Sequence, residues 1–108
     1  MEYLNKIELQ GNVGRCYIHA DCGVKYANFS IAVNDTYSDA DGNEVIETNW
    51  FNCVAFEGAN VKEEDLDNLM QLGSPINIKG RLHAKQYKGT DGLYHNTYEV
   101  YVSELKIL

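Results

Sequence analysis

The stretch TNWFNCVAFEG, residues 48–58, alternates like a β-strand but is apolar on both sides. Its even positions hold two large aromatic residues and a valine, namely Trp50, Val54 and Phe56. Its odd positions hold three other apolar residues, Phe51, Cys53 and Ala55. Successive side chains of a strand point to opposite faces, and the polar Thr48 and Asn52 share the even face. We therefore expect the odd set to point into a core and Trp50 and Phe56 to lie on the outer surface.

Four other segments alternate between apolar and polar residues with the period of two that is typical of a strand with one wet face. Their predicted inward residues are Ile7, Leu9 and Val13; Phe29, Ile31 and Val33; Ile76, Ile78 and Leu82; and Tyr98, Val100 and Val102. Turn residues separate the later strands at residues 41–43, DGN, and at residues 88–92, KGTDG. The sequence therefore predicts five strands and two connections that are long enough to reach outward.

One segment, NVKEEDLDNLMQLG at residues 60–73, breaks this alternation. Asn60 is the predicted N-cap of a helix because Glu63 follows three residues later and more acidic residues lie in the first turns. Gly73 is the predicted C-terminal stop. Apolar residues gather toward one side of this helix of about three turns, namely Leu66, Leu69, Met70 and Leu72. We expect the helix to plug an end of the sheet.

The predicted order is three strands, a helix and two strands. Among small five-stranded architectures, a helix between strands three and four is the arrangement of the oligonucleotide/oligosaccharide-binding (OB) fold, a partly open Greek-key barrel. A chain of 108 residues is long enough for one hydrophobic core and too short for two ordinary ones. The prediction is an all-β, five-stranded OB-fold barrel that forms a single domain over residues 1–108.

The net charge of −7 conceals an uneven distribution of charge along the chain. Ten acidic residues lie between residues 35 and 67, where Lys62 is the only base. Residues 76–90 carry four bases and no acid, namely Lys79, Arg81, Lys85 and Lys88. Binding to phosphate depends on Lys and Arg, which an acidic protein can still offer along one strand.

The composition, 44% hydrophobic and 23% charged, is typical of a soluble globular protein. No apolar run approaches the roughly 18 residues that a membrane span needs, and the first residues carry no basic leader. We therefore expect a cytoplasmic protein without a membrane partner. Its three cysteines, Cys16, Cys22 and Cys53, are then expected to remain thiols.

Little in the sequence points to catalysis or to a metal. Cys16, His19 and Cys22 are spaced three apart, but neither a CxxC pair nor a nearby fourth ligand accompanies them. No glycine-rich phosphate loop or GxSxG motif is present, and no spacing of the histidines enforces a nucleophile and base. The sequence predicts no enzyme activity, no cofactor, no metal and no small-molecule substrate.

The predicted outer face offers rings and positive charges together. Trp50 and Phe56 are candidate platforms for stacking nucleotide bases, and Tyr37 at the outer end of the second strand is a candidate third. The outward face of the fourth strand runs Lys79, Arg81, His83, Lys85 and Tyr87, followed by Lys88. Cations suit phosphates and rings suit bases, which favours binding of single-stranded DNA. The alternatives are a face covered by another subunit or by the long loops, and a strand face that is merely solvated.

Four stretches resemble the bacterial single-stranded DNA-binding proteins, in order and at that family's spacing. They are NKIELQGNVG at residues 5–14, ANFSIAVNDTY at 27–37, TNWFNCVAFEG at 48–58 and GSPINIKGRLHAKQY at 73–87. The resemblance implies base-stacking roles for Tyr37, Trp50, Phe56 and Tyr87. It also implies phosphate-contacting roles for Lys6, His83 and Lys85. It further implies a homodimer or a homotetramer, usually built from dimers that pair through the first strand.

The chain departs from this family in three places. Asn52 stands where a basic residue is common, which implies weaker or less salt-dependent binding. Tyr37 and Tyr87 stand where tryptophan is common in some members, which keeps a stacking ring. The sequence ends at SELKIL, residues 103–108, without the linker and acidic tail of the family, as in a short form or a piece of a longer protein.

The function expected from the sequence is sequence-independent binding and protection of single-stranded DNA in replication, repair, recombination or transfer. One alternative is an accessory replication or primosome module of the same fold that acts mainly through protein contacts. Another is an oligomeric structural module whose exposed rings become buried between subunits.

Overall fold

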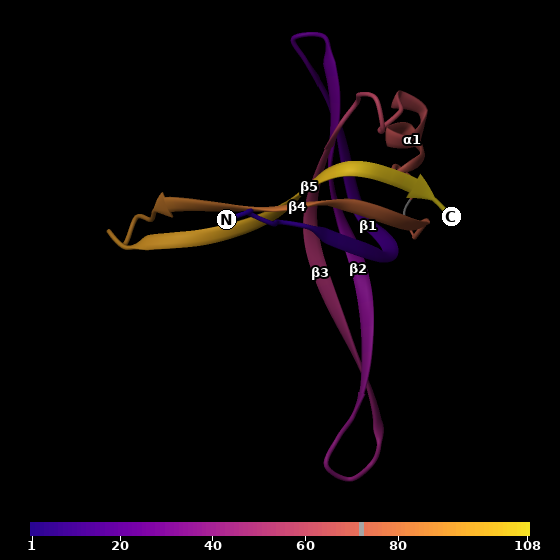
Figure 1. Ribbon diagram of the computed structural model, residues 1–108, viewed down its shortest axis with the longest axis vertical. Helices are drawn as coiled ribbons and strands as arrows, with labels where there is room; N and C mark the ends of the chain where they lie inside the picture. The colour runs from indigo at the N-terminus through magenta and orange to yellow at the C-terminus, as the bar shows by residue number, and fades with distance from the viewer. Residues whose placement is uncertain (72) are drawn as a thin grey trace.

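The computed structural model describes residues 1–71 and 73–108, which form five strands and one helix. The strands are β1 Ile7–Asp21, β2 Val24–Ser38, β3 Glu44–Phe56, β4 Pro75–Lys88 and β5 Tyr94–Ile107, and the helix is α1 Glu63–Asn68. The strands close a barrel in the order β1-β2-β3-β5-β4, in which only β3 and β5 pair in parallel (Figure 1). This arrangement confirms the predicted five-stranded OB-fold barrel with a helix between strands three and four.

Strand β1 closes the barrel because it pairs with two different neighbours. Residues Ile7–Asn12 pair with β4, and residues Asn12–Asp21 pair with β2. The pairing register with β2 shifts between Val13 and Cys16, where the strand carries an irregularity of the β-bulge type. A bulge bends its strand and increases the local twist, which lets β1 turn from one partner to the next.

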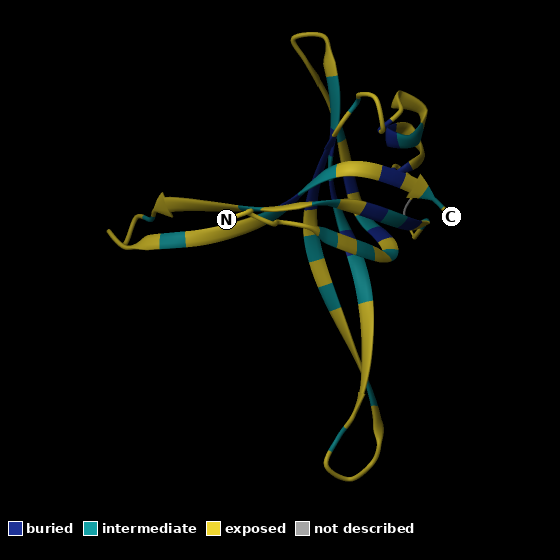
Figure 2. Ribbon diagram, viewed as in Figure 1, coloured by how far each residue is buried: buried dark blue, intermediate teal, exposed yellow. Residues whose placement is uncertain are grey.

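The barrel interior follows the predicted alternation closely. Cys53 and Ala55 are buried and Phe51 packs partly buried against the core, as expected from the odd positions of residues 48–58. Two residues at inward positions are wrongly predicted: Leu82 and Tyr98 remain 41% and 55% exposed. Leu82 pairs with the buried Val100 at the rim of the barrel, and Tyr98 pairs with Ala84 one step further out. Beyond this rim, β4 and β5 continue as a largely exposed hairpin, where less core is left to cover side chains (Figure 2).

Helix α1 is shorter than predicted and begins later. Its N-cap is Lys62, without a side-chain capping hydrogen bond, rather than Asn60. Gly58 and Val61 form an isolated β-bridge, and Val61 is buried in the core. This bridge holds the chain in an extended turn through residues 58–61, so the helix cannot start at Asn60.

The helix nevertheless caps the core with its apolar side. Leu66 and Leu69 are fully buried, whereas Met70 is 52% exposed, and the predicted position of Leu72 lies outside the described residues. The ammonium of Lys25 on β2 lies 2.5 Å from a carboxylate oxygen of Asp67 and 3.3 Å from one of Glu63. These ion pairs fasten α1 to the barrel wall.

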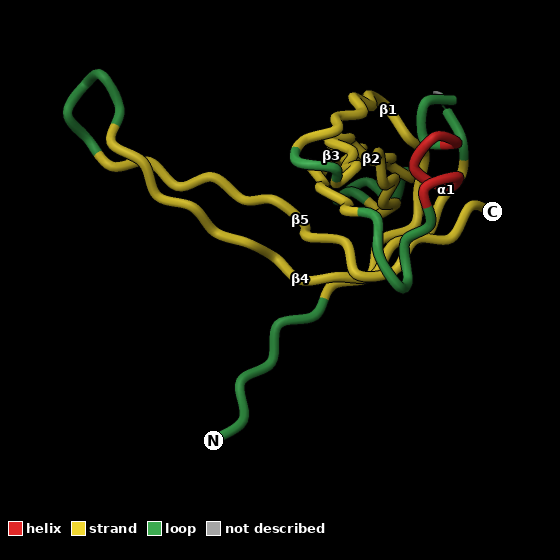
Figure 3. Tube along the Cα trace, turned by 90° about the horizontal axis from the view of Figure 1, so that it is seen from above, coloured by secondary structure: helices red, strands yellow, loops and turns green. Residues whose placement is uncertain are grey.

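Three hairpins extend from the barrel as arms, which we name by their strands. The β1–β2 arm turns at Cys22 and Gly23, whose positive φ angles of 52° and 80° make a two-residue turn. The β2–β3 and β4–β5 arms turn at the two predicted connections and point in different directions (Figures 1 and 3). Within the described residues, no helix is long and apolar enough to cross a membrane.

Candidate nucleic-acid interface

The outer face of β3 presents two bare aromatic rings. Trp50 is 62% exposed and Phe56 is 50% exposed, which confirms that this face of the strand points away from the core. The two residues are six positions apart, or about 20 Å at the rise of a β-strand. The arms of the same chain leave both rings open.

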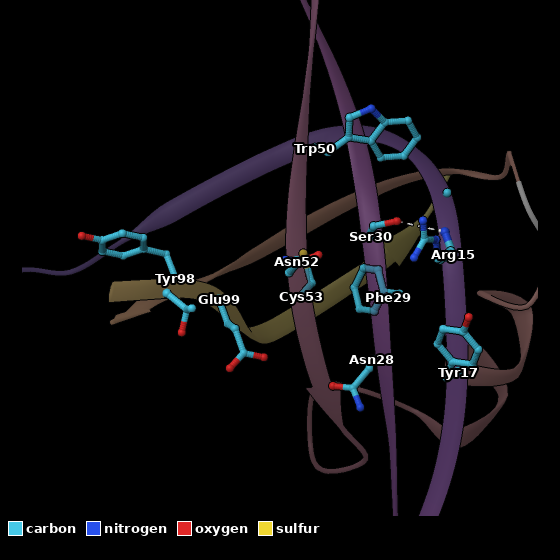
Figure 4. A pocket seen from close by; sticks show the side chains of 12 residues that line it. Arg15, Tyr17, Asn28, Phe29, Ser30, Trp50, Asn52, Cys53, Tyr98 and Glu99 are labelled. Atoms are coloured by element: carbon cyan, nitrogen blue, oxygen red, sulfur yellow. Dashed lines mark hydrogen bonds between the residues drawn. The ribbon is translucent and has the colours of Figure 1, made fainter. Parts of the chain in front are cut away.

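A cleft opens beside Trp50 where two strands of the barrel diverge. Strands β3 and β5 pair only at Cys53–Ala55 and Val100–Val102, and beyond this point they separate. The cavity here has a volume of about 690 Å³, is lined by residues of β1, β2, β3 and β5, and reaches from Trp50 to Tyr98 (Figure 4). It is large enough to receive a nucleobase between aromatic walls.

Polar groups complete the lining of this cleft. Asn28, Ser30 and Asn52 contribute side-chain hydrogen-bonding groups from β2 and β3, and Arg15 contributes a positive charge from β1. The Arg15 backbone N–H donates a hydrogen bond of 2.9 Å to Oγ of Ser30, which ties the β1 bulge to β2. Glu99 of β5 also lines the cleft, and its carboxylate pairs with the Lys85 ammonium. The rings, the neutral polar groups and the Arg15 cation together suit a nucleotide with its base and phosphate.

The outward face of β4 is less free than its sequence suggests. The Lys85 ammonium lies 2.9 Å from Oε1 of Glu99, and the Lys79 ammonium lies 3.8 Å from Oε2 of Glu104. The hydrogen bond that the Lys85 ammonium donates to Glu99 is the largest cause of the raised pKa of Lys85. Residues 76–90 contain no acid because both of these carboxylates stand on the neighbouring strand β5.

Arg81 and His83 share a ring instead of a carboxylate. The imidazole of His83 stacks on Tyr101 with ring centroids 4.4 Å apart, and the Arg81 guanidinium carbon lies 5.5 Å from the same Tyr101 centroid. Stacking on Tyr101 fixes both side chains along the outer surface. They form the centre of the predicted basic stripe.

The remaining predicted residues do not line the cleft. Tyr87 is half exposed on the β4–β5 arm, where it stacks on His95 at 5.4 Å and lines a small cavity with Lys88. Tyr37 is half exposed on the β2–β3 arm, and Lys6 directly precedes β1. The structure thus places Trp50 and Phe56 on one strand but puts Tyr37 and Tyr87 on separate arms.

Sequence reasoning missed several residues of this surface, namely Arg15, Tyr17, Tyr98 and Tyr101. Tyr101 already stood on the polar side of its strand, so its alternation could have identified it. Arg15 lies in the bulge of β1 and Tyr17 follows it, and this bulge interrupts the alternation that started at Ile7. Tyr98 seemed inward because the point where the barrel ends cannot be read from periodicity.

The residues of the CYIHADC segment do not converge. Cys16 is buried in the core, His19 is exposed and Cys22 forms the β1–β2 turn. Across residues 1–71 and 73–108, no group of three His, Cys, Asp or Glu side chains could hold a metal ion. Burial raises the pKa of the Cys53 thiol to about 12, as expected of a core cysteine.

Comparison with known proteins gives consistent matches. The model of the Single-strand binding protein family matches residues 4–108. The single-stranded DNA-binding protein of Neisseria meningitidis serogroup A is 30% identical, over 97% of this chain and 60% of its own length. The corresponding protein of Oceanobacillus iheyensis is 35% identical, over 94% of this chain and 58% of its own length.

A solved structure has the same fold over the whole chain. The Plasmodium falciparum SSB complex with ssDNA superposes with a TM-score of 0.81 and 27% identity, covering 100% of this chain and 97% of that one. The chain spans about three-fifths of the length of the two curated relatives described above. With the family model matched from residue 4 to the last residue, the chain belongs to the single-strand binding protein family.

Proposed function

We propose that this chain binds single-stranded DNA with little sequence preference and catalyses no reaction. The observation that carries the proposal is the exposed indole of Trp50, which stands at an open cleft beside polar groups and Arg15. A base that stacks on an aromatic side chain contributes roughly 1–3 kcal/mol, whichever base it is. Phe56, Tyr37 and Tyr87 are further stacking positions in this proposal.

Phosphate groups would follow the outer face of β4. Arg81 and His83 are held there by Tyr101, and Lys6 and Lys88 add charge on either side. Lys79 and Lys85 already pair with carboxylates, but exposed ion pairs contribute only about 0–1 kcal/mol. A phosphate can therefore replace Glu99 or Glu104 as the partner at little cost.

The related proteins support the same assignment. The relatives are named single-stranded DNA-binding proteins, and the matched Plasmodium falciparum structure is a complex with ssDNA. By this analogy the chain acts as one OB domain in a cytoplasmic homodimer or homotetramer. It would coat strands that are exposed during replication, recombination, repair or transfer of DNA.

Titration with oligo(dT) tests the proposal directly, because Trp50 is the only tryptophan of the chain. Stacking on Trp50 should quench its fluorescence. Affinity should fall with salt at a log–log slope of about −0.7 per phosphate contact. The variant Trp50→Ala should bind oligo(dT) more weakly by about 1–3 kcal/mol. Fluorescence anisotropy of a labelled oligonucleotide measures this loss. Trp50→Phe keeps a ring and should retain much of the affinity.

Ile46→Ala provides a matched control on the same strand and face. Ile46 is as exposed as Trp50 but has no ring, so its removal should leave DNA binding unchanged. An absence of quenching would contradict the proposal, and so would normal binding by Trp50→Ala. Loss of the oligomer in Trp50→Ala, measured by analytical ultracentrifugation, would identify the outer face as a subunit interface instead.

A further inference from the structure

Strand β1 carries a second row of rings and charge on the outside of the barrel. From the bulge onward, its outward positions are Arg15, which lies in the bulge itself, and then Tyr17 and His19, all of which are exposed. The three alternate at period two, with a cation followed by two aromatic rings. Rings can stack on bases and a cation can contact phosphate, so this row suits a nucleotide chain. The row lies two strands away from Trp50 and Phe56.

This row lies on the same outer surface as the β3 platforms. At one end, the benzo ring of Trp50 reaches across β2 and lies against Gly14, the neighbour of Arg15. In the middle, Tyr17 stands opposite Asn28, which in turn stands opposite Val54 of β3. Strands in a sheet are about 4.8 Å apart, so the β1 row runs about 10 Å from the β3 row.

At the other end, a stack of three rings joins β1 to β3. His19 stacks on Tyr26 with centroids 5.0 Å apart, and Tyr26 lies 5.2 Å from Phe56 at an interplanar angle of 34°. Tyr26 lies between its two neighbours. The outer rings, His19 and Phe56, therefore offer the free faces, so that the Phe56 platform continues as far as His19.

The edge of the sheet beyond His19 is open. Within the described residues, the pairing of β1 with β4 ends at Asn12, well before Tyr17 and His19. The outward residues from Arg15 to His19 on β1 and from Tyr26 to Ser30 on β2 are Arg15, Tyr17, His19, Tyr26, Asn28 and Ser30, none of which is a carboxylate. Two acids flank the row: Asp21 is the next alternate position of β1, and Glu99 lines the same cleft as Arg15 and Tyr17. A phosphate chain would therefore meet like charge only at the ends of the row.

We propose that Arg15, Tyr17 and His19 form a second track for single-stranded DNA along β1. Tyr17 and His19 stack bases, Arg15 contacts a phosphate, and Tyr26 is a positioning residue that joins His19 to Phe56. The track rests on the proposed function, because it extends the same bound strand across β2. A strand that leaves Trp50 or Phe56 can then continue onto β1 instead of leaving the protein at β3.

Single substitutions on β1 test the track. Tyr17→Ala and His19→Ala should each weaken oligo(dT) binding by about 5- to 150-fold, the range for one base–ring stack. Tyr17→Phe keeps the ring and should bind like the wild type. Arg15→Gln should make the log–log salt slope shallower by about 0.7. Tyr3→Ala, an exposed tyrosine outside the sheet, is the matched control and should have no effect.

Photocrosslinking gives a readout that needs no substitution. Oligonucleotides containing 5-iodouracil should crosslink the wild-type protein at Tyr17 or His19, mapped by mass spectrometry of the peptides. Unchanged affinity in both alanine variants, or crosslinks confined to β3 and β4, would overturn the β1 track. If oligo(dT) still quenches Trp50 in that case, the proposed function stands. A wild-type protein that does not bind oligo(dT) overturns both proposals.

Discussion

The benzo ring of Trp50 lies directly against Gly14, although the two residues belong to strands that do not pair with each other. A Cβ atom at position 14 would clash with Cζ3 of Trp50 and would lie 2.9 Å from both its Cη2 atom and Oγ of Ser30. Glycine thus provides the space that the indole occupies above β1. One side of the indole thus rests on the sheet, while the residue stays 62% exposed.

Adding one methyl group at this position should therefore damage DNA binding. In Gly14→Ala the indole must move off β1, so the stacking platform is lost or displaced while the barrel interior is untouched. We expect oligo(dT) affinity to fall by up to about 1–3 kcal/mol, the value of one stack. Tryptophan emission should also shift in the free protein. Gly58→Ala is the control, since a Cβ there meets open space, and equal binding by both variants would contradict the mechanism.

The ion pair between Lys85 and Glu99 predicts that one substitution should raise the affinity for DNA. Glu99 is the partner that a phosphate would have to replace, so Glu99→Gln should release Lys85 for DNA. We expect tighter binding to oligo(dT) at low salt and a salt slope steeper by about 0.7. Glu104→Gln should act more weakly, because its 3.8 Å pair with Lys79 is looser. Weaker binding in Glu99→Gln would show that Glu99 itself positions the cleft.

The fold could be predicted from sequence because strand alternation and turn residues act locally. Ile31, Ile76 and Ile78 stand at predicted inward positions and are fully buried. The helix was misplaced at its start because the competing Gly58–Val61 bridge is a tertiary contact that propensity does not record. Capping patterns describe what a helix prefers, and the burial of Val61 outweighed that preference.

The site could be predicted only where a single strand carries it. Trp50 and Phe56 were found because they alternate with Cys53 and Ala55 in one segment. The partners of Lys79 and Lys85, Glu104 and Glu99, come from the other strand β5, so the pairing register is needed to find them. The β1 row was hidden for a third reason, the bulge that changes which residues of β1 face outward.

Because α1 caps the core, two apolar residues in and after this helix should contribute very differently to the stability of the fold. Leu66 of α1 is fully buried against the core, so Leu66→Ala should lower the free energy of unfolding by about 2–5 kcal/mol through lost burial and a cavity. Met70 is half exposed, so Met70→Ala should lower the free energy of unfolding much less than Leu66→Ala does. Urea unfolding followed by Trp50 fluorescence measures both. Similar losses would mean that α1 does not seal the core.

The tip of the β4–β5 arm should loosen in acid. The Leu93 N–H donates a hydrogen bond of 2.9 Å to Oδ1 of Asp91, and Nε2 of His95 lies 3.0 Å from Oδ2. These contacts, the Leu93 hydrogen bond foremost, lower the pKa of Asp91 below 3.8. A lowered folded-state pKa contributes stability that is present above the unfolded-state value and is lost as the pH falls through the folded-state one.

Amide hydrogen exchange at Leu93 should therefore accelerate below about pH 4, beyond its intrinsic pH dependence. His95 supports the ring of Tyr87 from below, so the platform on this arm should become mobile in the same range. Asp91→Asn still accepts the Leu93 hydrogen bond but carries no charge, and its exchange should show no such transition. If the wild type and Asp91→Asn respond identically to acid, then Asp91 does not hold the tip, and Tyr87 depends on the strand pairing alone.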